Sequence, residues 1–305
     1  MAGSQDYAAD PRNAAARIYL NGEMVAREDA KVSILDAGFV LGDGVWEGLR
    51  LHRGALMFLD EHLDRLFWGA KAIALDLAMT RDDVVAALWK TLDTNAMTDG
   101  VHIRLMVTRG MKTAANQDPR NALGQPTMVI IAEHKLPGPA LAIRGLSLAS
   151  VSIRCTPREM FDMRLNSHSR LNLIIALNEA IAVGADEALM LDPHGHVASC
   201  NATNFFWARD GRLFTATGDY CFNGVTRGRV IALAKAHDVP LSIGGFPLEE
   251  AQNADEAFVT GTFGGVTPVR EIDGRALPHG TPGPLTARMK GLYDALKDAE
   301  ATTAS

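Results

Sequence analysis

The stretch from Arg164 to Ala180 reads RLNSHSRLNLIIALNEA, and the stretch from Gly184 to Phe206 reads GADEALMLDPHGHVASCNATNFF. The periodicity of the first predicts a helix from about Arg170 to Val183. The second predicts a strand over Ala188–Leu191 and, after a turn, another that starts at Asn204. A helix followed at once by short strands predicts an α/β or α+β protein.

The turn in the second stretch contains Asp192, His194 and His196, which are residue types that can bind a metal ion. Asp-Pro-His-Gly is also a common composition for a tight turn between two strands. We therefore interpret this stretch as a turn and predict no metal site.

Outward from these stretches, the chain divides into two halves. Asn21-Gly22 predicts a hairpin over Arg17–Glu23, and Asp60 is the expected N-cap of a helix that runs to Leu77. A stretch rich in Pro and Gly, KLPGPA, starts at Lys135 and predicts a linker. We expect a mobile tail at 1–16, a small α+β domain at 17–134, a linker at 135–145 and a larger domain at 146–300.

Composition excludes several classes of protein. The chain has 305 residues, of which 30 are Lys or Arg and 36 are Asp or Glu, so its net charge is -6. Such a balance favours neither nucleic-acid nor membrane binding. No apolar run reaches the roughly 18 residues of a membrane-spanning helix. The cysteines Cys155, Cys200 and Cys221 lack metal-type spacing and predict reduced thiols in a cytoplasmic protein.

Three short motifs complete a pattern that extends over most of the chain. They are Arg65 in HLDRL, Gly224-Val225-Thr226-Arg227, and Gly261-Thr262. With the two quoted stretches, they resemble the class IV (fold type IV) pyridoxal-phosphate enzymes: branched-chain and D-amino-acid aminotransferases and aminodeoxychorismate lyase. The resemblance implies a small N-terminal α+β domain, a larger domain with a barrel-like β core, and a homodimer.

In that family the three motifs bind the phosphate of the cofactor. Free N–H groups at a helix N-terminus and an arginine fork suit an anion. Taken singly, Arg65 is more commonly a surface arginine and Gly224–Arg227 a helix cap. Their joint occurrence in family order favours a phosphate cup made of Arg65, Gly224, Val225, Thr226, Gly261 and Thr262.

The residues expected to contact the cofactor ring or the substrate depart from the family. The lysine that forms the Schiff base is matched by Asn166, or by Leu165 in the branched-chain register, and neither can form one. The glutamate beside the pyridine nitrogen is matched by Ser199, and the tyrosine near the phenolic oxygen by Arg170. Where Gly-Thr-Ala-Ala is usual, Phe263 and Gly264 follow Thr262.

Other residues have weaker assignments. His168 is a candidate general base, although a structural role is at least as plausible. Arg104 matches an arginine that lines the branched-chain substrate pocket, with a solvent-facing strand residue as the equal alternative. Leu41 stands in the place of an active-site tyrosine. Arg109 begins a loop in which the arginine of the D-amino-acid enzymes has no match.

Neutral drift would scatter the departures from the family over the whole chain. Here they fall on the residues expected to contact the cofactor ring or the substrate, whereas the residues expected to bind the phosphate are kept. This partition favours, first, an enzyme that binds pyridoxal phosphate, pyridoxamine phosphate or another small ligand with phosphate or carboxylate groups non-covalently and runs a lyase or dehydratase step. A binding or regulatory protein without catalysis is the second hypothesis. A conventional aminotransferase with a displaced base is the third.

Overall fold

The computed structural model describes residues 3–303, and the chain forms two compact units. Unit 1 comprises Met1–Ala8, Pro137–Arg164 and Leu171–Lys297; unit 2 comprises Ala9–Leu136, Leu165–Arg170 and Asp298–Ser305. The short segment Leu165–Arg170 therefore belongs to unit 2, although the chain on both sides of it belongs to unit 1.

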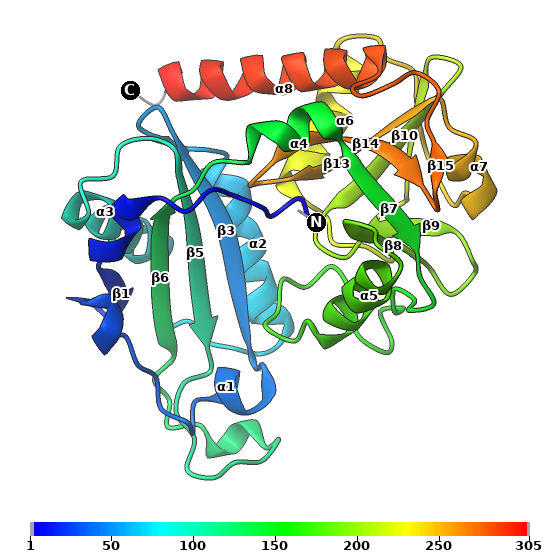
Figure 1. Cartoon of the computed structure of the whole chain (residues 1–305). Coiled ribbons are helices and arrows are strands. Elements are labelled where there is room, and N and C mark those ends of the chain that lie inside the picture. Colours follow the sequence, from blue (N-terminus) through cyan, green and yellow to red (C-terminus); the bar gives the residue numbers. More distant parts are fainter. Residues whose placement is uncertain (1–2, 304–305) are drawn as a thin grey trace. The chain divides into compact units, whose positions relative to one another are not determined.

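Unit 2 is built on a six-stranded sheet with the order β2-β1-β6-β5-β3-β4 (Figure 1). All of its neighbouring strands are antiparallel. Burial alternates along β5 and β6, as expected for strands with one face against a core. The strands are β1 (Ile18–Leu20), β2 (Glu23–Val25), β3 (Gly44–His52), β4 (Ala55–Leu56), β5 (Val101–Thr108) and β6 (Thr127–His134).

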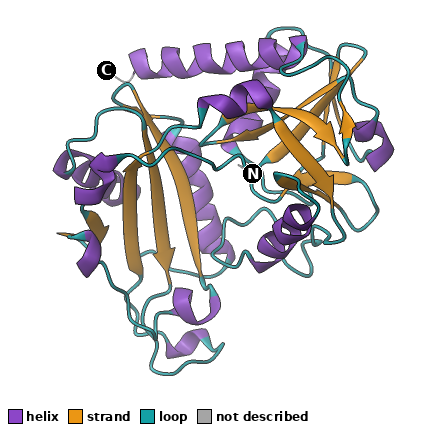
Figure 2. Ribbon diagram, in the orientation of Figure 1, coloured by secondary structure: helices purple, strands orange, loops and turns teal. Residues whose placement is uncertain are grey.

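The core face of this sheet is covered by α2 (Leu59–Ala72) and α3 (Arg81–Thr94) (Figure 2). The buried leucines of both helices belong to one apolar cluster with residues of the strands. Thr80 and Asp83 form a capping box at the start of α3. The prediction that Asp60 caps α2 is wrong. Phe58 is the N-cap, in the left-handed region at φ 53°, and Asp60 lies in the first turn, where its charge suits the helix dipole.

Residues 166–168 extend the sheet of unit 2 along an edge of β3. The Trp46 N–H donates to the Asn166 carbonyl at 2.9 Å, and the His168 N–H donates to the Gly44 carbonyl at 3.0 Å. Ser167 lies opposite Val45 in an antiparallel bridge. These main-chain bonds explain why the segment belongs to unit 2.

Unit 1 is built on a nine-stranded mixed sheet. The order is β12-β11-β10-β13-β14-β7-β8-β9, with β15 beside β14. The strands are β7 (Leu146–Ser150), β8 (Glu187–Leu191), β9 (Val197–Cys200), β10 (Asn204–Arg209), β11 (Arg212–Thr215), β12 (Leu241–Ile243), β13 (Glu256–Gly261), β14 (Gly265–Ile272) and β15 (Arg275–Ala276). The mixture of sheets and helices confirms the predicted α+β class.

Two apolar clusters pack against this sheet. One contains Phe205 and Trp207 of β10, and the other contains Ala176 and Ala180 of α5. The helices are α4 (Pro139–Arg144), α5 (Leu171–Ala182), α6 (Val225–Ala236), α7 (Leu248–Gln252) and α8 (Pro284–Thr303), the last of which continues into unit 2. None of the helices within residues 3–303 is long and apolar enough to cross a membrane.

The predicted tail and linker contain ordered structure. In the tail, the Ser4 N–H donates to the buried Glu187 carboxylate at 3.1 Å, and Asn13 exchanges two hydrogen bonds with the main chain of His134. In the linker, residues 139–144 form α4, with Pro139 at its first turn. The domain boundaries given above stay a prediction.

Candidate functional site

Asn166 is buried and its side chain is held in one orientation. Its Oδ1 accepts a short hydrogen bond from the Arg170 guanidinium. The same guanidinium donates to the Ser167 carbonyl at 3.0 Å and the Leu165 carbonyl at 3.2 Å. Arg170 thus binds the main chain of Leu165 and the amide of Asn166, the two residues predicted as alternative matches to the lysine of the family.

Arg170 lies in a positively charged environment. The pKa of its guanidinium is lowered to about 10, first by burial and then by the charges of Arg65 and Arg104, against the opposing effect of Glu47. The charges of Arg65 and Arg104 thus repel the Arg170 guanidinium, whereas the carboxylate of Glu47 attracts it. An acidic ligand group in this place would offset their repulsion.

Trp46 is a shared platform for two arginines of unit 2. The guanidinium carbon of Arg104 lies 3.7 Å from the centroid of the Trp46 ring, and that of Arg170 lies 5.7 Å from it. Such stacking holds a guanidinium in place and leaves its N–H groups available. No residue in the described range 3–303 accepts a hydrogen bond from the exposed Arg104 side chain.

Arg65 is bound to an anion of its own unit. Its Nε and Nη2 donate to both oxygens of the Glu47 carboxylate at 2.7 Å, and His62 Nδ1 contacts the same carboxylate at 2.7 Å. Burial raises the pKa of Glu47, but Arg65 and His62 outweigh it, so this pKa lies below its ordinary value. The predicted contact of Arg65 with a phosphate stays a prediction.

His168 packs against the backbone of β3. A Cβ on Gly44 would lie 2.7 Å from the His168 ring carbon Cδ2, so this approach requires glycine. The His168 Nε2 is buried and has no partner among the described residues. Burial lowers the pKa of the imidazole. Burial therefore favours the neutral imidazole, but its Nε2 is enclosed by the described chain.

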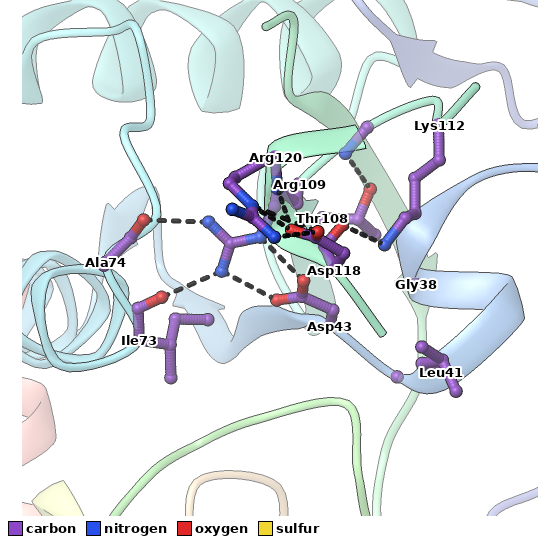
Figure 3. Close-up of polar contacts among 12 residues, drawn as sticks. Gly38, Leu41, Asp43, Ile73, Ala74, Thr108, Arg109, Lys112, Asp118 and Arg120 are labelled. Carbon is purple, nitrogen blue, oxygen red and sulfur yellow. Dashed lines mark hydrogen bonds and ion pairs between the residues drawn. The ribbon is translucent and has the colours of Figure 1, made fainter. Parts of the chain in front are cut away.

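Leu41 and Arg109 lie in the loops at one end of the sheet of unit 2 (Figure 3). Leu41 ends the short helix α1 (Ala37–Leu41), and its side chain is exposed. Arg109 donates to the Asp43 carboxylate at 2.6 and 3.0 Å and to the carbonyls of Ile73 and Ala74 at 2.8 Å. These bonds tie the end of α2 to the end of β5, so Arg109 has a structural role.

In unit 1, the N-terminus of α6 offers unpaired donors. The N–H groups of Val225, Thr226 and Arg227 have no acceptor within residues 3–303, and no side chain caps this helix. A Cβ on Gly224 would lie 2.4 Å from Asn204 Oδ1, so only glycine fits there. Free first-turn N–H groups and the helix dipole fit the phosphate of a pyridoxal cofactor or of another small ligand.

A buried cation adds to this end of α6. Arg227 is largely buried, and it forms no ion pair with a carboxylate of the described chain. Its guanidinium donates to the Ala216 carbonyl at 2.5 Å and to Asn223 Oδ1 at 3.4 Å, while its Nε lacks a partner. A buried charge without a counter-ion is costly, so it favours an anion nearby.

Ser199 does not supply a charge to this part of unit 1. It is buried on β9, and its hydroxyl donates to the Thr203 carbonyl at 2.9 Å. Thr203 in turn donates to Glu187 at 2.7 Å. Burial raises the pKa of Glu187, which is enclosed by the described chain. The first turn of α6 and Arg227 therefore fit a phosphate. Ser199, however, does not replace the acid expected beside a pyridine nitrogen.

The turn between β13 and β14 contains the remaining predicted contacts. Gly261 and Thr262 are half-buried, whereas the Phe263 ring is buried and does not line an open surface. A Cβ on Gly264 would lie 2.8 Å from Thr267 Oγ1, which explains the second glycine. The contact of Gly261 and Thr262 with a phosphate stays a prediction.

The candidate metal stretch forms a turn, as predicted. Asp192 Oδ1 accepts hydrogen bonds from the N–H groups of His194 and His196 at 2.8 Å each. Within residues 3–303, no group of three His, Cys, Asp or Glu side chains is placed to bind a metal ion.

Sequence reasoning did not identify Trp46, Glu47 or Arg227 as parts of the site. Trp46 and Glu47 face opposite sides of β3, and only the register of β3 with β5 brings Trp46 close to Arg104. The residue pattern could have shown the alternation but not the register. Arg227 stands in a quoted motif, yet its lack of a carboxylate partner is visible only in three dimensions.

Known proteins were compared with the whole chain. A family model described as amino-transferase class IV matches residues 44–272. The branched-chain-amino-acid aminotransferase-like protein 2 of Arabidopsis thaliana is 38% identical over 293 residues, which cover 94% of this chain and 51% of that protein. The chain therefore spans about half the length of this relative.

A second relative, from Methanocaldococcus jannaschii, is named a putative branched-chain-amino-acid aminotransferase; it is 37% identical over 275 residues, 90% of this chain and 94% of the relative. Among solved structures, a branched-chain amino acid aminotransferase complexed with N-(5'-phosphopyridoxyl)-L-glutamate superposes with a TM-score of 0.85. It is 28% identical, with 94% of this chain and 95% of that chain covered. The chain therefore belongs to the class IV aminotransferase family and has the fold type IV architecture.

Proposed function

We propose that this protein binds pyridoxal phosphate, pyridoxamine phosphate or another small phosphorylated ligand without a covalent bond and does not run ordinary transamination. The observation that carries the proposal is the state of residue 166. An amide stands there, and Arg170 binds its oxygen. In the family this place belongs to the lysine that bonds to the cofactor.

Three of the other lysines are engaged by the chain itself. Lys112 is buried, but its Nζ donates to the carbonyls of Asn116 and Asp118 at 2.7 and 3.0 Å in a loop. Lys290 and Lys297 pair with Asp294. Lys135 would be the strongest candidate for a displaced amine, because partial burial and Arg104 lower its pKa.

The phosphate would be held by the first turn of α6 and by Thr262, with the charge of Arg227 behind it. The solved aminotransferase described above is complexed with a phosphopyridoxyl compound, and the open N–H groups of Val225 and Thr226 support a ligand of that kind here. When bound, a pyridoxal cofactor acts as an electron sink, most strongly with an acid at its ring nitrogen. Ser199 provides no such acid, which argues against full cofactor chemistry.

Two functions are compatible with such binding. The buried Nε2 of His168 leaves no evident base and favours a binding or regulatory protein. The exposed guanidinium of Arg104 could instead hold a water molecule or an acidic group, which favours a lyase or dehydratase step. A homodimer in the cytoplasm completes the proposal.

Borohydride reduction followed by peptide mass analysis tests the central claim. The purified protein is incubated with pyridoxal phosphate, its absorption spectrum is recorded, and the mixture is reduced and digested. We expect ligand retention without a Schiff-base band and without a stoichiometric pyridoxyl group on any lysine. A full equivalent on Lys135 would replace the proposal by the displaced-base aminotransferase. A metabolite screen with the loaded protein then separates an enzyme from a binding protein.

A further inference from the structure

Residues 3–8 form a short segment that is bound to the rest of unit 1 at both of its ends. Near its start, the Ser4 N–H donates to the Glu187 carboxylate at 3.1 Å. Near its end, Tyr7 lies opposite Pro137 in an antiparallel bridge. All of these residues belong to unit 1. We call residues 3–8 the N-terminal strap.

The carboxylate of Glu187 anchors this strap. Glu187 is buried on β8, and its two oxygens accept hydrogen bonds from two neutral donors, the Ser4 N–H at 3.1 Å and the Thr203 hydroxyl at 2.7 Å. A carboxylate inside a protein is costly unless it is hydrogen-bonded. The strap therefore completes the environment of Glu187, and Glu187 in turn holds Ser4, which is also buried.

The two residues that donate to Glu187 lie against the two ends of the turn between β13 and β14. A Cβ on Gly261 would lie 3.5 Å from Thr203 Cγ2, and a Cβ on Gly264 would lie 3.8 Å from the Ser4 carbonyl oxygen. Both are ordinary van der Waals distances, so Thr203 packs at the start of the turn and Ser4 at its end. Glu187 thus fixes both residues that flank this turn.

We infer that the N-terminal strap is a conformational device that holds the turn between β13 and β14 in its present shape, with Glu187 as the positioning residue. Release of the strap removes Ser4 from Gly264 and so loosens Thr262 on the same turn. The step from this turn to ligand binding rests on the proposed function, because Thr262 is predicted there to contact a phosphate. The hold of the strap on the turn does not depend on a ligand.

Hydrogen–deuterium exchange of the full chain, read by mass spectrometry of peptides, tests the inference. Ser4→Glu places a second carboxylate against Glu187 and should displace the strap. We expect amide exchange in the strap and in residues 262–264 to rise roughly tenfold to a hundredfold, the range for the loss of one hydrogen bond to a charged group. Gln5→Glu adds the same charge at the exposed neighbouring residue and should leave both segments unchanged.

Glu187→Gln tests the anchor itself. The NH2 group of the new amide would face one of the two donors, so the strap and the turn should both exchange faster, within the same range. Glu179→Gln is the matched control. Glu179 also accepts hydrogen bonds from an N–H and a hydroxyl, both of Ser152, but it does so at the surface.

The exchange data decide the inference without any ligand. Full exchange of the strap in the wild-type protein at the earliest time point would overturn it, and so would a strap freed by Ser4→Glu beside an unchanged turn. If Glu187→Gln does not fold, Ser4→Glu still decides, because its change lies in the strap and not in the sheet.

Calorimetry with pyridoxal phosphate then tests the step to ligand binding. Ser4→Glu should bind it more weakly than the wild-type protein and Gln5→Glu equally well, whereas equal affinity in both variants would overturn this step. A wild-type protein that does not bind pyridoxal phosphate would contradict the proposed function and leave the exchange result on the strap as it stands.

Discussion

At the scale of single residues, the double variant Asn166→Lys with Ser199→Glu should regain a Schiff-base absorption band with pyridoxal phosphate. Arg104 and Arg170 would lower the pKa of the new lysine, because like charges disfavour its protonated form, and the neutral amine is the form that reacts. Absorption spectroscopy and borohydride trapping at residue 166 measure the effect, with Ser199→Glu alone as the control.

Little amino-group transfer is expected from that variant, because the family resemblance matches the exposed Leu41 and the cationic Arg170 to tyrosines. Rapid transamination of branched-chain or D-amino acids would show that the substrate site was never changed. Neutral drift would then explain the sequence better than a new specificity.

Glu47→Gln should destabilise the protein by about 3–5 kcal/mol at neutral pH, because it removes the buried carboxylate that pairs with the largely buried Arg65. The folded-state pKa of Glu47 lies below the ordinary value of 4.5, so its stabilising contribution is complete above that pH and is lost as the pH falls. The difference from the wild-type protein should therefore shrink in acid. Urea unfolding at several pH values measures it, and Asp64→Asn, at an exposed ion pair with Arg81, should cost little at any pH.

Individual candidate residues could be named from the sequence, but their partners could not. Asn166 and Arg170 are both visible as departures from a family pattern. The bond between them depends on the extended path of residues 166–168 along β3, which no local pattern indicates. The role of Glu47 could not be predicted for the same reason, because its partners His62 and Arg65 lie 15 and 18 residues away on α2.

At the scale of secondary-structure elements, Val225→Pro should weaken binding of pyridoxal phosphate by about 1.5–3 kcal/mol, since it removes one N–H donor to an anion. Val225 is the first residue of α6 and Gly224 before it is extended, at φ -63° and ψ 139°, so proline fits both positions. Calorimetry gives the affinity and thermal melting the stability.

Arg81→Pro, at the equivalent position of α3 after the extended Thr80, is the control for the cost of a proline at this place. It should leave ligand affinity unchanged. An unchanged affinity in Val225→Pro as well would exclude the N-terminus of α6 from the phosphate site.

Most helices and long strands were predictable, because they follow the usual periods and carry their own boundary signals. The exceptions have physical reasons. β14 contains Pro268, which cannot donate to a ladder and so indicates an edge or a loop, yet this strand lies between β13 and β7. The helix α4 was not predicted, because the glycines and prolines of this stretch indicate a linker.

At the scale of the whole molecule, the protein should sediment as a dimer. The helix α5 has exposed apolar side chains at Leu171, Ile174, Ile175 and Ile181, spaced so that they lie along one face. An apolar face of this kind is typical of a protein interface. Ile174→Glu with Ile181→Glu should shift the sedimentation coefficient to that of a monomer.

Surface charge alone is controlled by Glu substitutions at the exposed polar residues Arg158 and Asn253, which lie outside α5 and should keep the dimer. A wild-type protein that sediments as a monomer over a range of concentrations would contradict the prediction.

The two-unit organisation itself was predictable from the length and the family resemblance. The assignment of residues 165–170 and of the end of α8 to unit 2 was not, because it depends on contacts distant in sequence.

The pairing of residues 166–168 with β3 also has an evolutionary consequence. The bonds that hold Asn166 in place are made by its carbonyl and by the N–H of His168, which every residue but proline has in common. A change of the side chain at 166 therefore leaves these main-chain bonds in place. Selection can therefore act on the side chain at 166 separately from the main-chain pairing that holds residues 166–168 on β3.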